Sequence, residues 1–510
     1  MVRNVQLTAA ALALAVALPA FAKPITAVVR LKEKMSIENL AYNVQNPGSE
    51  RFGKAYTPDE IRSLAGPSDV DYQQTLSALK AEGFTILAES PTHLWISVKG
   101  DSSLFESTFS TQIANTSKGT RFALSEAAVP TRLGTIAAVH GLDNRRHAFP
   151  KFVKASAPLD DTASHGGVTP ETIKSAYGFN PIYSSGLSGK GQHIAIATYD
   201  GFHIADVQAF YQLINLSPVP AVDQVQFNGN PAVNDNSAME TELDAEFSGM
   251  IAPGASIHVF ASNENSDAGE LAMFTAILDD NRAKIVNYSW GSCESSLTPA
   301  HQAEMAKVFA RAVAQGVNVM VASGDSGSDS CQNNTTAADW PAANPNVVAV
   351  GGTTFAQDHG SLSETGWAGS GGGISALWDL PDWQKAIGGI YVKRSYPDVS
   401  FNADPSSGQA VYVTYNGSPT WLTIGGTSMA APQWSGFMAL VGEARANAGK
   451  TALGFLPPII YALTPDEKST MFHDVTSGNN GTYSCSAGWD AVTGWGSLQA
   501  SPLLTRLQSN

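Results

Sequence analysis

One serine lies where a nucleophile would be expected. Ser428 belongs to the stretch TIGGTSMAAP (423–432), in which an apolar run is followed by two glycines. The glycines permit a tight turn, and Pro432 falls early in the helix predicted to follow. Free backbone N–H groups at a helix start can stabilise a developing oxyanion. The pattern predicts Ser428 as a nucleophile, with an ordinary N-cap serine as the alternative.

Two carboxylates in ETELD (240–244) could act as the base that such a serine needs. Glu240 and Asp244 are four residues apart, so on a helix they share one face. Like charges at that spacing repel unless they share a proton or have a task. A glutamate still accepts a proton in acid, where a histidine would be protonated. We therefore predict Glu240 as general base and Asp244 as its partner; the alternative is an acidic, solvated helix carrying also Glu242 and Glu246.

A third carboxyl, Asp325, follows a strongly apolar strand in VASGDSGS (321–328). The string GDSG also occurs in chymotrypsin-like enzymes, but these are all-β proteins, which makes Ser326 a poor nucleophile. Aspartic proteases need two such turns, and this chain has one. A carboxyl at a strand end that stays protonated can donate a hydrogen bond to an oxyanion. This role is predicted for Asp325, and it requires acidic conditions.

The 510 residues suffice for two domains, and their charge is divided unevenly. Residues 1–22 read as a secretory signal peptide with an A-x-A cleavage site, which predicts a secreted protein. Residues 23–160 contain 16 Lys+Arg and 14 Asp+Glu, a balance of +2, whereas 161–510 contain 13 and 31, a balance of −18. Such an acidic chain argues against nucleic acid as a partner, and no later apolar run suggests a membrane span.

Hydrophobic patterning divides the chain at the same place. Residues 24–155 mix strand-like runs, such as 25–31, with helical patterns, such as 71–82, and read as a small α+β domain. The stretch 155–168 has the composition of an exposed linker. From residue 169 onward, short apolar runs alternate with helical segments, which predicts a mostly parallel α/β sheet covered on both faces. Functional loops in such sheets follow the carboxyl ends of the strands.

Together these motifs resemble the sedolisins, the serine-carboxyl peptidases. The resemblance covers almost everything after the signal peptide and rests on ETELD (240–244), NYSWG (287–291), ASGDSG (322–327), SGGGIS (370–375), YPDVSFNADP (396–405) and GGTSMAAP (425–432). It implies a subtilisin-like fold, a catalytic set of Glu240, Asp244, Asp325 and Ser428, and endopeptidase or tripeptidyl-peptidase activity in acid. It also implies that residues 23–160 are an activation prodomain and that 161–510 form the catalytic domain.

The same resemblance implies a calcium loop near the C-terminus, formed by FHDVT (472–476) and SAGWDAVTGWGS (486–497). Two carboxylates and several carbonyls suit a hard cation. By motif match the ligands are the side chains of Asp474 and Asp490 and the carbonyls of Val475, Ser486 and Gly488. Cys293 and Cys331 follow their motifs as a bridged pair does in some family members, which would leave Cys485 free; three unpaired cysteines remain the alternative.

The expected partners are polypeptide substrates and the protein's own propeptide, acting as an intramolecular inhibitor of a monomeric enzyme. The opposed charges suggest that acid weakens the attraction between the two domains. Two alternatives remain. One is a neutral subtilisin using Asp200, His203 or His193, and Ser428. The other is a non-catalytic binding protein that keeps the fold.

Overall fold

The computed structural model describes residues 24–116, 120–155, 167–227, 229–235, 237–358, 361–388 and 392–510. The predicted signal peptide lies outside these ranges, and so does most of the predicted linker, 156–166. Within the described ranges, no helix combines the length and apolar character that crossing a membrane requires.

The N-terminal domain is built on a four-stranded antiparallel sheet, in the order β2 (Thr85–Glu89), β3 (Trp95–Gly100), β1 (Ile25–Leu31) and β6 (Ile136–His140). Successive side chains of β1 point to opposite faces of this sheet, and each face packs against a different core. Ile25, Ala27, Val29 and Leu31 pack with α3 (Asp69–Glu82) and α4 (Ser102–Phe109), whereas Val28 and Trp95 join the core of the second domain. The predicted α+β prodomain is therefore confirmed as a fold.

The second domain contains the predicted sheet, which is parallel along most of its width. Seven consecutive pairings, from β10 through β24, are parallel, while β23 and β17 add antiparallel edges. Its apolar strands are buried, as expected when helices cover both faces. The order is β10 (Ala221–Gln224), β11 (Ser256–Ala261), β9 (His193–Thr198), β12 (Ile285–Tyr288), β14 (Asn318–Ala322), β16 (Val348–Asp358), β20 (Val399–Asn402), β24 (Ser497–Leu498) and β23 (Phe472–His473), with β17 (Ser361–Gly366) on β16.

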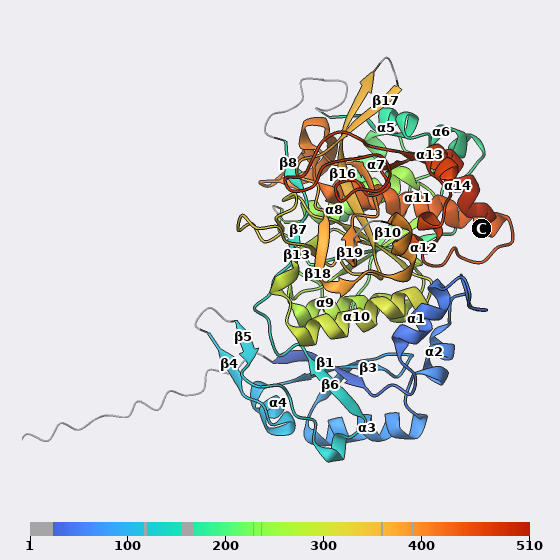
Figure 1. Cartoon of the computed structure of the whole chain (residues 1–510). Helices are drawn as coiled ribbons and strands as arrows, with labels where there is room; N and C mark the ends of the chain where they lie inside the picture. Colours follow the sequence, from blue (N-terminus) through green and yellow to red (C-terminus); the bar gives the residue numbers. More distant parts are fainter. Residues whose placement is uncertain are drawn as a thin grey trace, which may run out of the picture.

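Helices cover this sheet in two layers (Figure 1). On one face, α8 (Met239–Ile251) packs against α11 (Thr427–Asn447), which crosses β12, β14, β16 and β20. On the other face, α9 (Asp267–Asp280) and α10 (Pro299–Ala314) lie between the large sheet and the prodomain, where they contact β1 and α1 (Ile37–Gln45). The predicted subtilisin-like α/β architecture is confirmed. Both helices that carry predicted catalytic residues, α8 and α11, lie on the same face.

The motif NYSWG (287–291) is divided between two strands of different sheets. The strand β12 ends at Tyr288, and β13 (Trp290–Cys293) then pairs with β15 (Asp339–Trp340) and with β7 (Phe149–Pro150). The chain therefore leaves the large sheet at Ser289. Ser289 therefore lies at the carboxyl end of the sheet, where the predicted functional residues gather.

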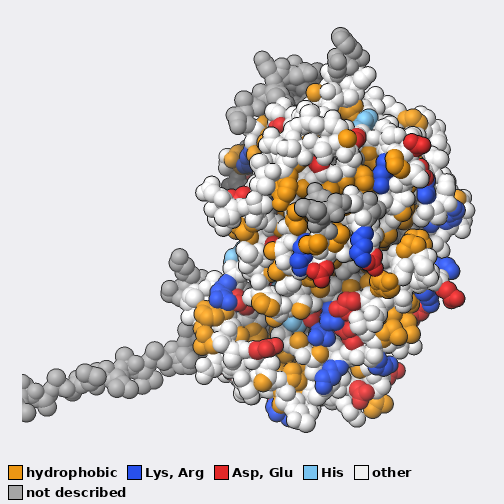
Figure 2. Space-filling view, in the orientation of Figure 1, with side chains coloured by type: hydrophobic (Ala, Val, Ile, Leu, Met, Phe, Trp, Pro, Cys, Tyr) orange, Lys and Arg blue, Asp and Glu red, His pale blue; other side chains and the backbone are white. Residues whose placement is uncertain are grey.

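Besides apolar packing, cations of the prodomain meet carboxylates of the catalytic domain. Arg121 pairs with Glu264 at 2.8 Å, and Arg146 pairs with Asp267 at 2.5 Å and also with Glu270. Side chains of both charges lie close together around the domain boundary on the face shown in Figure 2. The uneven charge of the two domains is thus expressed as specific, partly buried ion pairs.

Glu304 on α10 is a second deeply buried carboxylate of this boundary. It accepts hydrogen bonds from Arg30 Nε at 2.7 Å and from Trp95 Nε1 at 2.5 Å, and its side chain is 2% exposed. Burial by itself would raise the pKa of Glu304, but His140, Arg30 and Trp95 outweigh burial and hold the pKa below its ordinary value.

Replacing Glu304 with alanine should destabilise the precursor, because it leaves a buried guanidinium and an indole N–H without their acceptor. We expect the free energy of unfolding to fall by about 3 kcal/mol in urea titrations of a Ser428→Ala precursor. Glu82→Ala removes an exposed partner of Arg132 and is the matched control, with an unchanged midpoint expected. Equal effects of the two variants would contradict this assignment.

Candidate active site

Ser428 and Glu240 meet at the carboxyl end of the sheet, as predicted. Ser428 is the second residue of α11, which begins directly after Gly426, a glycine with φ +107°. The Ser428 hydroxyl donates a hydrogen bond to Glu240 Oε2 at 3.0 Å, and both side chains are buried. A carboxylate in this position can take the proton of the hydroxyl as it attacks.

Asp244 continues the chain of polar groups one turn further along α8. Its Oδ1 accepts a hydrogen bond from Ser289 Oγ at 2.6 Å, and Ser289 in turn accepts one from Asn287 Nδ2 at 3.0 Å. The second oxygens, Glu240 Oε1 and Asp244 Oδ2, are buried without a hydrogen-bond partner among the described residues. Each carboxyl thus keeps one oxygen available for a proton shared between the two.

Burial decides the protonation of this pair. Loss of solvent, and then the neighbouring Asp244, raise the pKa of Glu240 well above its ordinary value, and burial also raises the pKa of Asp244. Two interacting carboxyls release their protons in separate steps, so a state with one proton on the pair lies between the doubly protonated and the fully ionised states. The alternative of a solvated acidic helix is wrong, because Glu242 and Glu246 are also buried and accept hydrogen bonds from the amides of His203 and Tyr412.

Asp325 lies in the loop after β14 and faces the start of α11. Its Oδ1 accepts hydrogen bonds from the Thr427 amide at 2.8 Å and from the Thr427 hydroxyl at 2.9 Å. Its Oδ2 is buried without a hydrogen-bond partner among the described residues, and burial raises the pKa of Asp325 to about 7. In acid the carboxyl is therefore neutral, and Oδ2 can carry the proton that an oxyanion would accept.

The segment that connects the two domains runs through this site. Its strands β7 and β8 (Val153–Lys154) pair with β13 and with β22 (Ser418–Gly425). Between them, the carbonyl of Lys151 accepts a hydrogen bond from the Ser428 amide at 2.8 Å, and the Lys151 amide donates to the Ser289 carbonyl at 3.0 Å. A Cβ atom on Gly426 would fall 2.3 Å from the Lys151 oxygen and 2.6 Å from Asp325 Oδ2, so only glycine fits there. A peptide carbonyl thus lies next to the serine, the base and the neutral carboxyl.

The chain is similar to known peptidases and to their activation domains. Residues 19–145 match the family model "Pro-kumamolisin, activation domain", and residues 229–496 match the "Subtilase family". Sedolisin of Pseudomonas sp. (strain 101) is 30% identical over 525 residues, spanning 94% of this chain and 86% of the relative. Kumamolisin of Bacillus sp. (strain MN-32) is 37% identical over 396 residues, spanning 71% and 68%.

The chain belongs to the sedolisin family. It is a peptidase of this family with an N-terminal activation domain, that is, a zymogen. A solved structure of Pseudomonas sedolisin, complexed with two molecules of pseudo-iodotyrostatin, has a TM-score of 0.60 and 31% identity over 68% of this chain and 98% of that one. Fervidolysin from Fervidobacterium pennivorans, at 16% identity and a TM-score of 0.51, shows the fold alone. Tripeptidyl-peptidase 1 of Canis lupus familiaris is 26% identical over 95% of this chain and 91% of its own length.

The histidines considered for a neutral subtilisin do not join this sedolisin-family site. His203 contacts Glu242 at 3.1 Å and Asp235 at 3.4 Å, and His193 contacts His258 at 2.9 Å. In the part of the chain that the structure describes, no histidine forms a hydrogen bond with Ser428. His203, Asp206 and Glu242 lie close enough to hold a metal ion, and Asp206 and Glu242 each also accept a hydrogen bond from a backbone amide.

Hydrogen bonds connect two pairs of the five residues expected to bind calcium near the C-terminus. Asp490 Oδ2 accepts a hydrogen bond from the Ser486 amide at 3.1 Å, and Asp474 Oδ2 accepts one from the Gly488 amide at 2.9 Å. The loop that supplies two carbonyls therefore lies between the two carboxylates. No hydrogen bond from a described residue reaches the carbonyls of Val475, Ser486 or Gly488. This oxygen-only donor set fits a hard cation.

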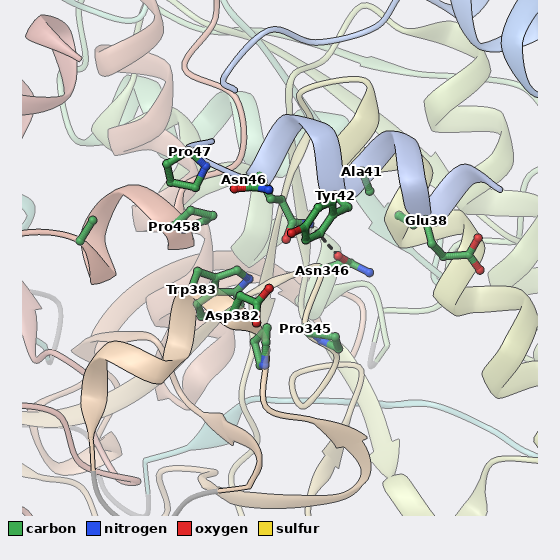
Figure 3. A pocket seen from close by; sticks show the side chains of 14 residues that line it. Glu38, Ala41, Tyr42, Asn46, Pro47, Pro345, Asn346, Asp382, Trp383 and Pro458 are labelled. Carbon is green, nitrogen blue, oxygen red and sulfur yellow. Dashed lines mark hydrogen bonds between the residues drawn. The ribbon is translucent and has the colours of Figure 1, made fainter. Parts of the chain in front are cut away.

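The cysteines and the pocket of Figure 3 lie outside the set of residues around Ser428. Cys293 and Cys331 form the expected disulfide, which joins two loops beside the cleft, and Cys485 is buried and unpaired. A pocket of about 410 Å³ lies between prodomain helix α1 and the catalytic domain, where Tyr42 and Trp383 face each other (Figure 3). Because both domains line this pocket, it is a feature of the precursor. Among the described residues, its lining contains no serine, threonine, cysteine, lysine or histidine.

Three residues of the site were missed by the sequence analysis. Ser289 lies inside the recognised motif NYSWG, and Thr427 directly precedes the predicted nucleophile, so the motifs contained both without indicating a role. Lys151 had no signal, because nothing in its sequence context shows that the connecting segment occupies the cleft.

The elevated pKa of Asp325 makes a testable contribution to stability. The folded protein holds the Asp325 proton up to about pH 7, whereas an unfolded aspartate holds it only to about pH 4. The free energy of unfolding that this proton contributes is therefore fully present below pH 4 and is lost as pH rises toward 7. Asp325→Asn cannot ionise. The free energy of unfolding of Asp325→Asn minus that of wild type should therefore rise by about 1–4 kcal/mol from pH 4 to pH 7, because only wild type loses stability. Denaturant unfolding in a Ser428→Ala background measures this difference. The exposed Asp382→Asn is the control; parallel pH profiles for all three proteins would refute this assignment.

Proposed function

We propose that this protein is a secreted, acid-active serine-carboxyl endopeptidase that first cuts its own precursor. The observation that carries the proposal is the arrangement of Ser428 between Glu240 and the Lys151 carbonyl. The hydroxyl contacts a carboxylate base on one side, while the neighbouring amide binds a peptide carbonyl on the other. The family membership supports peptide hydrolysis as the reaction.

In the proposed reaction, Glu240 takes the proton of Ser428 Oγ as this oxygen bonds to the substrate carbonyl carbon. Asp244 shares the proton that Glu240 receives, as the third group does in other triads. The Ser428 amide and protonated Asp325 then donate hydrogen bonds to the oxyanion. The peptide C–N bond breaks as Glu240 returns the proton to the leaving amine. Water attacks the resulting acyl-enzyme with Glu240 again acting as base, which releases the second product and restores Ser428.

The path of the connecting segment favours internal cleavage over removal of tripeptides. Upstream of the Lys151 carbonyl, Pro150 and Phe149 pair with β13, and Ala148 exchanges two hydrogen bonds with Asn265 at 2.8 and 2.9 Å. Downstream, the chain continues along β22 to Ala155. A cleft that holds a longer chain on both sides of the serine suits an endopeptidase. A tripeptidyl-peptidase would instead need a barrier after the third residue.

Acid would act unequally on the contacts that retain the propeptide. Although burial by itself would raise the pKa of Glu270, Arg146 and His301 hold it at about 2, so this pair persists in moderate acid. Burial raises the pKa of Asp339, the partner of Lys151, to about 6, and it also raises that of Asp279, which binds Ser90 of the prodomain. We therefore propose that acid first loosens the contacts that Asp339 and Asp279 make with the prodomain. Precursor processing should be faster at pH 4 than at pH 7 when its mass is followed with time; equal rates would contradict this.

The remaining parts of the proposal rest on the sequence and on the donor set near the C-terminus. The signal-like residues 1–22 support secretion. Calcium would be held by Asp474 and Asp490 with the carbonyls of Val475, Ser486 and Gly488, and its charge would fix this loop against the sheet edge. A monomer is proposed, since a single chain supplies every catalytic group.

Replacing the nucleophile distinguishes a peptidase from a non-catalytic binding protein. Ser428→Ala should abolish both self-processing and peptide hydrolysis. Glu240→Gln should slow both by about 10²–10⁴-fold, because the base is lost while the shape is kept. Ser326→Ala, in the neighbouring GDSG string, is the control and should process normally. Processing of the Ser428→Ala precursor at the wild-type rate, followed by mass spectrometry, would refute the proposal.

Removal of calcium should destabilise the processed protein. At neutral pH a chelator should lower the Tm by roughly 5 °C, because the ion binds the folded state only. Asp490→Asn should have a lower Tm already and show little further change with chelator. A wild-type Tm that neither chelator nor added calcium alters would exclude the site.

A further inference from the structure

The side chain of Lys151 enters a pocket of its own while its carbonyl contacts Ser428. Its Nζ lies 2.6 Å from Asp339 Oδ2, and the two side chains are 12% and 1% exposed. The carbonyl position makes Lys151 the residue before the bond that Ser428 would cut, and Phe152 the residue after it. The pocket around Lys151 is therefore the one that contacts the first residue on the acyl side of a substrate.

Glycines form the walls of this pocket and Asp339 closes it. A Cβ atom on Gly291 would fall 2.5 Å from Asp339 Oδ1 and 2.8 Å from Lys151 Cε, and one on Gly324 would fall 3.2 Å from Asp339 Oδ2. The slot therefore admits a long, unbranched side chain and presents a carboxylate at its end. The Tyr396 hydroxyl accepts a hydrogen bond from the Asp339 amide at 2.7 Å, which fixes the strand that carries this carboxylate.

The charge of the Asp339 carboxylate is stabilised by the side chain that occupies the pocket, here Lys151. Asp339 Oδ1 has no hydrogen-bond partner among the described residues, and Oδ2 pairs with Lys151. When the propeptide leaves, a buried carboxylate remains with few donors. A neutral substrate side chain would leave that charge unpaired or require it to take up a proton, and either costs free energy. A basic side chain restores the ion pair.

We infer that Asp339 is a specificity-determining residue, which makes the enzyme prefer lysine or arginine immediately before the cleaved bond, and that the first self-processing cut falls between Lys151 and Phe152. This inference rests on the proposed peptidase function. A buried carboxylate closing the corresponding pocket gives trypsin its basic preference, on an unrelated fold. Lys154, three residues along, does not compete for the role, because its Nζ lies over the Tyr415 ring at 4.1 Å.

The preference should depend on pH. Burial raises the pKa of Asp339, and although Lys151 and Ser330 oppose this, the value stays at about 6; Glu294 adds to the rise. Asp325, the other carboxyl that interacts with Asp339, gains its proton over a similar range. As pH falls below 6, protons compete with the basic side chain for Asp339, so selectivity should decrease.

A competition assay tests the pocket directly. Peptides that differ only in the residue before the cleaved bond (Lys, Arg, Leu or Glu) are mixed and digested by the processed wild-type protein and by Asp339→Asn, at about pH 4 and about pH 6. For wild type at the higher pH we expect kcat/KM for Lys and Arg to exceed that for Leu by about tenfold or more. Asp339→Asn should lose this ratio, with kcat/KM for Lys and Arg falling toward that for Leu.

The ratio of two substrates is independent of the amount of folded enzyme, so partial misfolding does not obscure the result. A wild-type enzyme without basic preference, or an Asp339→Asn enzyme with an unchanged ratio, would overturn the inference. Wild type that cleaves none of the peptides would instead overturn the proposed function, and the inference with it.

The precursor provides a second test that keeps Asp339 intact. At about pH 6, where Asp339 still pairs with a basic side chain, Lys151→Leu should slow the first cut by about tenfold or more, Lys151→Arg should retain it, and Lys154→Leu should match wild type. Mass spectrometry at early times should find a new amino terminus at Phe152. A first cut elsewhere, or Lys151→Leu processing at the wild-type rate, would contradict the assignment.

Discussion

The active site depends on the removal of several carboxyl groups from water. Glu240, Asp244 and Asp325 are buried within reach of one serine, and burial is the largest cause of the raised pKa of each. A charge left alone in such a place is costly, so these groups retain protons that exposed carboxyls would release. The proposed reaction uses these protons: one shared by Glu240 and Asp244, and one that Asp325 offers to the oxyanion.

The fold brings these groups together from distant parts of the sequence. Helix α8 supplies the carboxyl pair, the loop after β14 supplies Asp325, and the start of α11 supplies Ser428. Thr427 links two of these elements, since its hydroxyl accepts a hydrogen bond from the Gly324 amide and donates one to Asp325. Ser289, which lies between strands β12 and β13, adds the hydroxyl that donates a hydrogen bond to Asp244. Each element ends at the same edge of the parallel sheet, as expected for a site in this class of fold.

Much of this was predictable from the sequence because local patterns encode it. Apolar runs indicated the strands, and the four-residue spacing of Glu240 and Asp244 placed them on one helix face. The burial of Glu242 and Glu246 was not predictable, since their pattern equally fits a solvated helix and only the packing of α7 (Ile204–Leu213) and β21 (Gln409–Tyr415) against α8 encloses them. The path of Lys151 through the cleft was also hidden, because it depends on pairing with strands more than a hundred residues away.

The central claim is that carboxyl protonation, not a histidine, controls the reactivity of Ser428. The most direct measurement is the pH dependence of kcat/KM for the processed enzyme on a peptide with leucine before the cleaved bond, because a neutral side chain does not pair with the charge of Asp339. The structure predicts a maximum in acid and a decline toward neutral pH, as Asp325 loses the proton that stabilises the oxyanion. Activity that instead rises through neutral pH and is greatest above about pH 7 would contradict the claim, since it would require a base that titrates like histidine.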